Sequence, residues 1–255
     1  MPITVAPSLP RRLHAIALTA AITLIGLPAT GALAQDFTPG ETQQIEDIVR
    51  NYLVANPEVI VDALDELQRR EEMAAAEAQS QAVANNRDAL FNNPDLPYMG
   101  ADEPGVTIVE FMDYQCGYCK RMLPALQALV EANDDLRIVL VDIPILGPTS
   151  VTAARAALAA RYQDGYGVMH ERMMGFDGQL SDDAVFRFAE EAGLDLARLR
   201  ADMERPEVVD QIQLNLSLAN ALGVRGTPAY VVGDNLIPGA IGQERLQQAI
   251  DALEG

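Results

Sequence analysis

The sequence predicts an α/β fold in which a strand–helix–strand unit is followed by a helical insertion and two further strands. Residues 106–112 and 136–143 form two apolar runs of the kind found in buried parallel strands. Between them, residues 120–132 carry apolar side chains at helical spacing. Helical patterns then fill residues 150–221, and short strands near 229–237 precede a last helix over 243–253.

The first 34 residues resemble a secretory signal peptide. Arg11 and Arg12 precede an apolar, uncharged stretch from Leu13 to Leu27, and Ala32-Leu33-Ala34 matches a cleavage site of the A-x-A type. The apolar stretch is short for a membrane span, so we expect cleavage after Ala34 and a mature chain that starts at Gln35. This predicts export across the inner membrane into a bacterial periplasm, where disulfides persist.

Residues 35–90 are predicted to form a helical segment. Ile45, Ile48, Val49 and Tyr52 lie on one face of the first helix. A thin apolar stripe continues through the second helix, and such a stripe cannot form a core by itself. We favour a self-association stalk over a helix that lies on its own domain, and the absence of a sustained heptad leaves the oligomeric state open.

Residues 91–104 contain three X-Pro pairs, and Gly105 directly follows the last of them, Glu103-Pro104, which predicts a linker with turn chemistry. The catalytic domain is then expected over 105–253, with its helical insertion at about 150–221. About 220 residues after the signal peptide are enough for one such domain and an appendage.

The charge composition argues against nucleic acid as a partner. The chain carries 37 acidic and 18 basic residues, a formal net charge of −19. Lys120 is the only lysine. A sequence without a basic patch is a poor match for phosphate backbones, whereas strong acidity suits a soluble exported protein.

The only two cysteines stand in the motif Cys116-Gly117-Tyr118-Cys119, at the junction of the first strand and its helix. Such a pair is either half of a zinc site, a structural disulfide or a redox-active dithiol. A zinc site within one chain would need further soft ligands, and the expected mature chain offers only His170 besides the two cysteines. A disulfide that spans two intervening residues restricts the unfolded chain little, so a redox-active dithiol is favoured over a structural disulfide.

The position at a helix start gives the two thiols different roles. Backbone N–H groups and the helix dipole favour thiolate at Cys116, which we expect to be the exposed nucleophile. Cys119, one turn further in, is expected to be the resolving thiol. Gly117 and Tyr118 lie between them and can tune the thiolate and contact the client. The cofactor is then the redox-active disulfide Cys116–Cys119, with no metal site expected.

Glu110 is an acidic residue in an otherwise apolar strand, six residues before Cys116. Alternation places it on the same side as Ile108 and Met112, beneath the helix. A buried carboxyl there could carry the proton of Cys119, and the alternative is a strand-end glutamate that reaches solvent.

Thr227-Pro228 precedes the third strand. A cis peptide there would expose the backbone of Thr227 for pairing with a client, and the alternative is an ordinary proline at the start of a strand. His170 and its neighbouring methionines Met169, Met173 and Met174 are expected to be core residues rather than a copper site.

Three features together resemble the DsbA-like thiol–disulfide oxidoreductases, which have a thioredoxin fold with an inserted helical domain. They are Phe111–Lys120 with its dithiol, the helical insertion, and Gly226-Thr227-Pro228-Ala229-Tyr230. The resemblance covers about 105–253. It implies that Cys116 is the nucleophile, Cys119 the buried cysteine, Glu110 the buried acid and Pro228 the cis-proline.

Residues 40–75 also resemble the N-terminal segment of the ScsC subgroup, the suppressors of copper sensitivity, some of which trimerise through it. Gly-Tyr between the cysteines and Thr before the proline depart from the oxidase prototype and look like isomerases. The resemblance implies a disulfide isomerase acting on unfolded or wrongly bridged secreted proteins. It also implies a membrane redox partner that recycles the dithiol. A disulfide-donating oxidase and a copper(I)-binding copper-tolerance protein stay open as alternatives.

Overall fold

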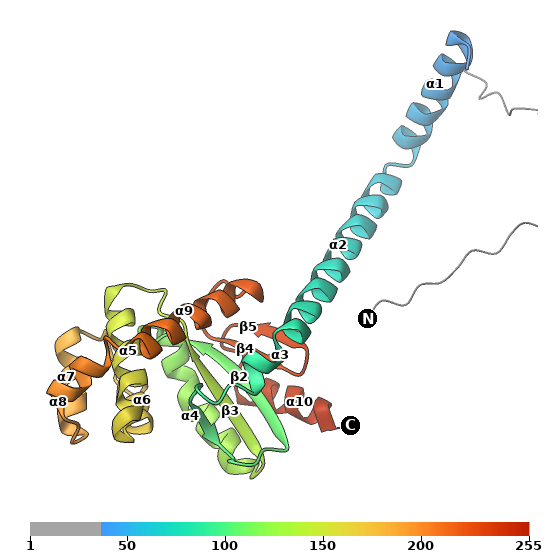
Figure 1. Ribbon diagram of the computed structural model, residues 1–255. Coiled ribbons are helices and arrows are strands. Elements are labelled where there is room, and N and C mark those ends of the chain that lie inside the picture. Colours follow the sequence, from blue (N-terminus) through green and yellow to red (C-terminus); the bar gives the residue numbers. More distant parts are fainter. Residues whose placement is uncertain (1–36, 255) are drawn as a thin grey trace, which may run out of the picture. The chain divides into compact units, whose positions relative to one another are not determined.

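A five-stranded mixed sheet forms the centre of the domain in the computed structural model, which describes residues 37–254 (Figure 1). The signal peptide expected at 1–34 lies outside the described residues. The strands run in the order β1-β3-β2-β4-β5, and only β2 and β3 are parallel. Their bounds are β1 Tyr98–Gly100, β2 Val106–Met112, β3 Leu136–Asp142, β4 Ala229–Val232 and β5 Asn235–Pro238.

Both faces of the sheet are covered by helices. Helix α4 (Gly117–Ala132) connects β2 to β3, and α10 (Gln243–Glu254) packs beside it on the same core. Helices α3 (Arg87–Phe91) and α9 (Pro206–Ala221) cover the opposite face. The alternation expected along β2 is therefore present: Ile108 and Met112 belong to the first core, and Val109 and Phe111 belong to the second.

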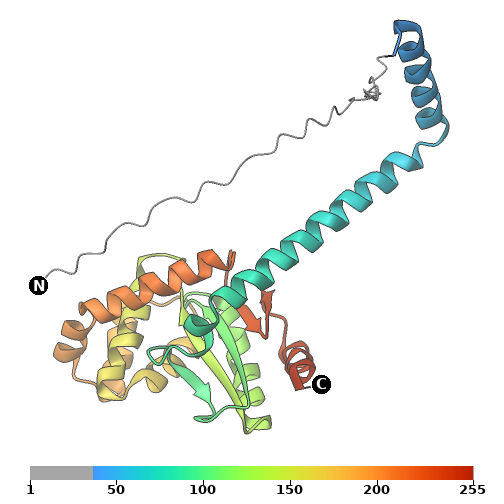
Figure 2. The ribbon, with the colours of Figure 1, turned by 45° about the vertical axis from the view of Figure 1, so that its right-hand side comes forward.

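The helices of the insertion that precede α9 gather at the end of the sheet away from α10, as both views show (Figures 1 and 2). The insertion's alanine-rich first helix has eight of its 13 residues buried, because small side chains let neighbouring helices approach closely. Met169, Met173 and Met174 are buried in this core as predicted. Before α9, the insertion consists of α5 Pro148–Ala160, η1 Arg161–Gln163, α6 Tyr166–Met174, α7 Asp182–Glu191 and α8 Leu196–Asp202.

The segment predicted as a linker contains a strand. β1 pairs antiparallel with β3, so Tyr98 lies opposite Val139 and Gly100 opposite Arg137. Gly100 has a φ of +95°, and a Cβ there would lie 2.1 Å from the carbonyl oxygen of Leu136. The sequence prediction of a plain loop over 91–104 is wrong at this point, because three residues next to a proline carry too little alternation to indicate a strand.

The N-terminal unit ends near Ile60 and contains α1 (Pro39–Ala55), which the sequence predicted. Thr38 and Glu41 form a capping box at its start. Among residues 37–254, the apolar stripe of α1 is exposed: Ile48 is 67% exposed and Tyr52 is 56% exposed. This is an unpartnered helix face.

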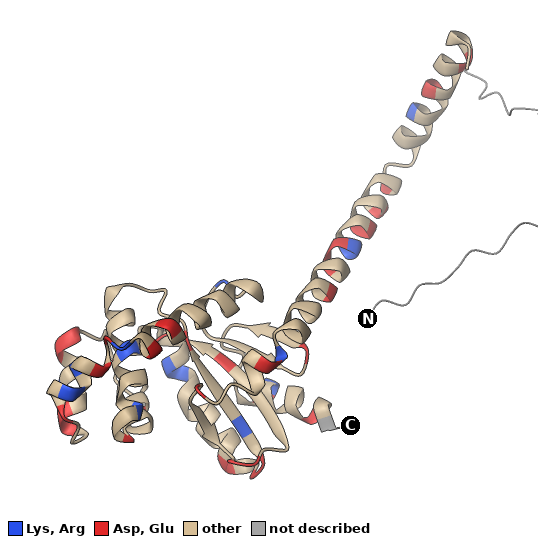
Figure 3. Cartoon of the chain, viewed as in Figure 1, with Lys and Arg blue, Asp and Glu red and all other residues tan. Residues whose placement is uncertain are grey.

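Helix α2 (Glu58–Asn85) begins in that unit and continues into the second one, where Val83 is fully buried in the core beneath α9. Figure 3 shows acidic residues spread over the helices. Over residues 37–254, none of the helices combines the length and the apolar character needed to cross a bilayer.

Candidate active site

Cys116 is the N-cap residue of α4. Its backbone is extended, with φ −75° and ψ 108°, and its Sγ accepts a hydrogen bond from the backbone N–H of Cys119 at 3.3 Å. The Cys116 N–H in turn donates to the carbonyl oxygen of Asp113 at 2.9 Å. A sulfur in this position satisfies one of the free N–H groups of the helix start, as predicted, and lies at the positive end of the helix dipole.

The two thiols have pKa values displaced in opposite directions. Hydrogen bonding from the Cys119 side chain, with help from Thr227 and backbone groups, outweighs burial and lowers the pKa of Cys116 to about 5. The same thiol–thiol bond, followed by burial and the nearby Glu110, raises the pKa of Cys119 far above its usual range. These shifts favour the thiolate at Cys116 and the protonated thiol at Cys119.

Cys116 was predicted to be an exposed nucleophile, but the structure buries most of this residue. Only 5% of the residue is exposed, against 2% for Cys119. The reason is the loop before β4: the Cys116 thiol lies 3.2 Å from the carbonyl oxygen of Thr227, within hydrogen-bonding distance. Between the cysteines, Gly117 and Tyr118 are exposed, and the guanidinium of Arg121 lies 4.2 Å from the centre of the Tyr118 ring.

Glu110 lies inside the protein, so the alternative of a glutamate reaching solvent is wrong. It is 2% exposed, and the Tyr230 hydroxyl donates to its Oε1 at 3.2 Å from the neighbouring strand. Burial, only partly offset by this hydrogen bond, raises the pKa of Glu110 to about 8. A group with a pKa near neutrality can both give and take a proton.

The Thr227-Pro228 peptide is cis. Beside it lies a hollow of about 400 Å³, whose walls include the apolar side chains of Val224, Leu236 and Pro238. The structure thus brings the carbonyl of Thr227, the hollow and the Cys116 thiol to one edge of the domain.

Asp113 organises the loop that carries the dithiol, and sequence reasoning missed it. Its Oδ1 accepts from the Ser150 hydroxyl at 2.7 Å and from the N–H of Gln115 at 2.8 Å. Its Oδ2 accepts from the N–H groups of Ile145 and Leu146 at 2.8 and 3.0 Å. The available signal was local: an aspartate at a strand end often bonds the N–H two residues later.

His170 does not reach the dithiol. It is 3% exposed, its Nδ1 lies 3.2 Å from the Tyr114 hydroxyl, and its ring stacks on Tyr166. Burial lowers the pKa of His170 to about 4. Asp142 is a second buried acid that the sequence did not indicate, and neither of its carboxyl oxygens has a hydrogen-bond partner among the described residues.

A family model for the DSBA-like thioredoxin domain matches residues 107–251, more than half of the chain. The chain belongs to the DsbA-like family. A second model, the copper resistance protein ScsC N-terminal domain, matches residues 41–74. Both matches agree with the resemblances noted in the sequence, and the thioredoxin fold with an inserted helical domain is confirmed.

Solved structures of similar proteins extend over most of the chain. A thioredoxin-like oxidoreductase from Silicibacter pomeroyi is 47% identical and has a TM-score of 0.65, with coverage of 66% of this chain and 98% of that one. ScsC of Proteus mirabilis in a transitional conformation is 29% identical, with a TM-score of 0.62 and coverage of 85% and 96%. BcfH of Salmonella enterica Typhimurium is 28% identical, with a TM-score of 0.69 and coverage of 85% and 97%.

The first curated relatives that this chain matches are longer proteins, and it spans about a quarter of their length. One is a Na(+)/H(+) antiporter, NhaA 3 of Salinispora tropica, which is 30% identical over 161 residues. That match covers 62% of this chain and 25% of the antiporter.

Proposed function

We propose that the protein is a periplasmic thiol–disulfide oxidoreductase that acts on cysteines of secreted proteins, mainly by rearranging their disulfides. The observation that carries the proposal is the pairing of a thiolate-forming Cys116, capping α4, with Cys119 held as a thiol one turn later. Disulfide exchange needs these two roles, a thiolate that attacks the client disulfide and a second thiol that can resolve the mixed disulfide.

The reaction begins with attack by the Cys116 thiolate on one sulfur of a client disulfide. A Cys116–client bond forms, the client disulfide breaks, and the second client sulfur leaves as thiolate. In isomerisation that thiolate attacks another client disulfide, and a later client thiolate attacks the mixed disulfide and releases Cys116. No net electrons are transferred.

Resolution by Cys119 gives a different outcome. Cys119 loses its proton to the Glu110 carboxylate and attacks Sγ of Cys116, so the client leaves as a thiolate and the Cys116–Cys119 disulfide forms. Two electrons pass from the dithiol to the client. In the reverse direction a client thiolate attacks the oxidised pair, and protonated Glu110 returns a proton to Cys119. A pKa of about 8 suits Glu110 to both directions.

Isomerisation is favoured over disulfide donation by two features. Gly-Tyr between the cysteines has no histidine that could stabilise the thiolate further. The uncovered apolar face of α1 supports self-association, which would place several dithiols in one particle where they can act on one client. A membrane redox partner that keeps the dithiol reduced completes the proposed cycle.

Refolding of scrambled ribonuclease tests the activity. The mature protein, kept reduced, is expected to restore ribonuclease activity, and Cys116→Ser is expected to abolish the effect. A wild-type protein that neither rearranges nor transfers disulfides would refute the proposal. Rapid oxidation of reduced ribonuclease without rearrangement would favour the oxidase alternative.

Light scattering of a matched pair of variants tests self-association. Ile48 lies on the apolar stripe of α1, whereas Val54 lies on the opposite side at 100° per residue and is 76% exposed. We expect Ile48→Glu to reduce the particle to a monomer and Val54→Glu to leave its mass unchanged. A wild-type monomer would contradict self-association.

Export is tested by cell fractionation. The protein with residues 1–34 is expected in the periplasmic fraction as a shortened chain starting at Gln35. A full-length chain that stays in the cytoplasm or the inner membrane would contradict this part of the proposal.

A second candidate function is copper(I) binding. The match of residues 41–74 to the copper resistance protein ScsC N-terminal domain favours it, and two adjacent thiols are soft ligands that suit Cu(I). Titration of the reduced protein against a chelator for Cu(I) separates the candidates. Binding without disulfide exchange would promote the copper role, and no binding would remove it.

A further inference from the structure

The residues on either side of the dithiol motif both hold the same loop of the helical insertion. Gln115 precedes Cys116, and its side-chain amide donates to the carbonyl of Leu180 at 3.1 Å and accepts from the Leu180 N–H at 3.0 Å. Lys120 follows Cys119, and its Nζ donates to the carbonyls of Phe176 and Gly178 at 2.9 and 2.7 Å. Four hydrogen bonds therefore fix loop 176–180 relative to the reactive thiol.

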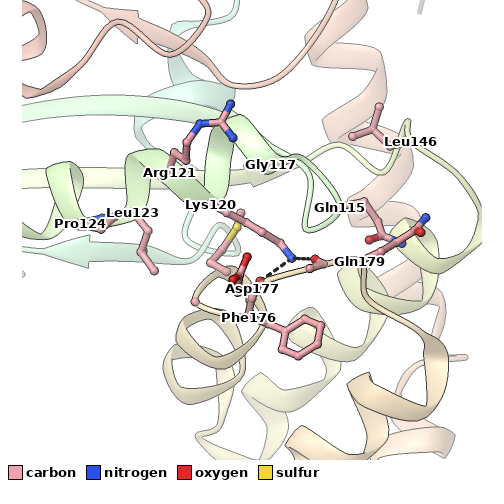
Figure 4. Close-up of a pocket in the computed structure, with 13 residues that line it drawn as sticks. Gln115, Gly117, Lys120, Arg121, Leu123, Pro124, Leu146, Phe176, Asp177 and Gln179 are labelled. Atoms are coloured by element: carbon pink, nitrogen blue, oxygen red, sulfur yellow. Dashed lines mark hydrogen bonds between the residues drawn. The ribbon is translucent and has the colours of Figure 1, made fainter.

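A pocket of about 660 Å³ lies between α4 and this loop (Figure 4). Figure 4 shows Lys120 reaching from α4 to the loop, with the side chains of Phe176 and Leu146 at its margins. Gly117, the residue next to Cys116, forms part of the wall. The pocket therefore begins beside the nucleophile, and none of the residues 226–228 lines it.

The pocket offers hydrogen-bonding groups that the domain does not use. The Lys120 ammonium has three N–H donors, and two are bound to the loop carbonyls, which leaves one. Pro124 lies inside α4 and lines the pocket. Because proline has no N–H, the backbone carbonyl of Lys120 lacks the donor that a helix normally supplies four residues later. One donor and one acceptor suit a polypeptide main chain better than a single charged group.

We infer that this pocket is a second client subsite, which holds the extended backbone of the client on the side of its cysteine that faces away from Thr227. The inference rests on the proposed function. The Cys116 thiol lies 3.2 Å from the Thr227 carbonyl, and the residues on either side of it, Gln115 and Gly117, line the pocket, so a client bonded to its sulfur lies next to both. Gln115 is a positioning residue, since it acts on the client through the loop that it holds. Lys120 holds the same loop, as the other half of this clamp, and also offers its remaining N–H and its backbone carbonyl to the client.

Amide hydrogen exchange on a trapped complex tests the subsite directly. Cys119→Ser retains the nucleophile and removes the resolving thiol, so a short cysteine peptide supplied as an activated disulfide stays bonded to Cys116. The matched control is the same variant with a methylthio group on Cys116. We expect amides of residues 176–180 to exchange about tenfold more slowly in the peptide complex than in the control.

Kinetics of Lys120→Met test the clamp. We expect the KM for the oxidised peptide client to rise about fivefold, the effect of losing hydrogen bonds of ordinary strength, with a smaller change in kcat. Dithiothreitol is too small to fill the pocket, so the ratio of the peptide rate to the dithiothreitol rate should fall. Arg187→Met, which removes one positive charge from α7, is the matched control and should leave this ratio unchanged.

The outcomes separate the subsite from the proposed function. If no mixed disulfide forms, the proposed function fails. If the complex forms and amide protection is confined to residues 224–229, the function stands and the subsite is wrong. Equal losses of the peptide and dithiothreitol rates in Lys120→Met would assign the clamp to folding and also overturn the inference.

Discussion

Removal of the Cys119 thiol should raise the pKa of Cys116. The largest cause of the low value, about 5, is the hydrogen bond from the Cys119 side chain, whereas the Cys119 backbone N–H remains in any variant. A hydrogen bond to a charged group contributes about 1.5 to 3 kcal/mol, which corresponds to about one to two pKa units. Cys119→Ala is therefore expected to titrate near pH 6 to 7, at about one to two units above the wild-type protein.

Thiolate absorbance near 240 nm, followed against pH in the reduced protein, measures this shift, and the pH dependence of alkylation by iodoacetamide checks it. Cys119→Ser keeps an O–H donor and should lie between the wild type and Cys119→Ala. An unchanged midpoint in Cys119→Ala would show that the helix start alone stabilises the thiolate, and the assignment of the thiol–thiol bond would be wrong.

Three further predictions concern the groups around the dithiol. Glu110→Gln should slow resolution of the mixed disulfide by about 10- to 100-fold. The same variant should be more stable than the wild type at pH 8. Folding raises the Glu110 pKa to about 8, so ionisation of Glu110 lowers the stability of the folded wild type as pH rises towards that value. The Cys116 thiolate should add unfolding free energy to the reduced protein from about pH 5 to 8.5, where the unfolded thiol binds more protons, and this gain opposes the loss from Glu110. The unfolding free energy of the wild type minus that of Cys116→Ser, from urea titrations, should therefore rise over this range. Asp113→Asn should lower the unfolding free energy by about 2 to 3 kcal/mol, because an amide replaces one accepting oxygen with a donor.

The pattern of the sequence predicted the strands and helices that bury continuous apolar surface. β2 and β3 are continuous apolar runs, and α4 and α10 have helical periodicity, so their positions followed from sequence alone. The position of β1 did not follow from sequence, because three residues are too few to show an alternating pattern and β1 forms only by pairing with the edge of β3. Tertiary pairing decided that element, not local preference.

Sequence alone predicted the site residues that have an unusual residue type at a characteristic spacing. The dithiol and Glu110 carry residue types that stand out in their segments. The accessibility of Cys116 did not follow, because its cover comes from Thr227, 111 residues later. The clamp by Lys120 was equally hidden, since the carbonyls it binds lie 56 and 58 residues away and any residue type could supply them.

Mapping of the trapped client tests the central claim most directly. Cys119→Ser is incubated with scrambled ribonuclease, digested without reduction and analysed by mass spectrometry. The account predicts mixed disulfides between ribonuclease cysteines and Cys116, with none in the double variant that also carries Cys116→Ser. Absence of any Cys116–client peptide under conditions where Cys116 is reactive to iodoacetamide would contradict it.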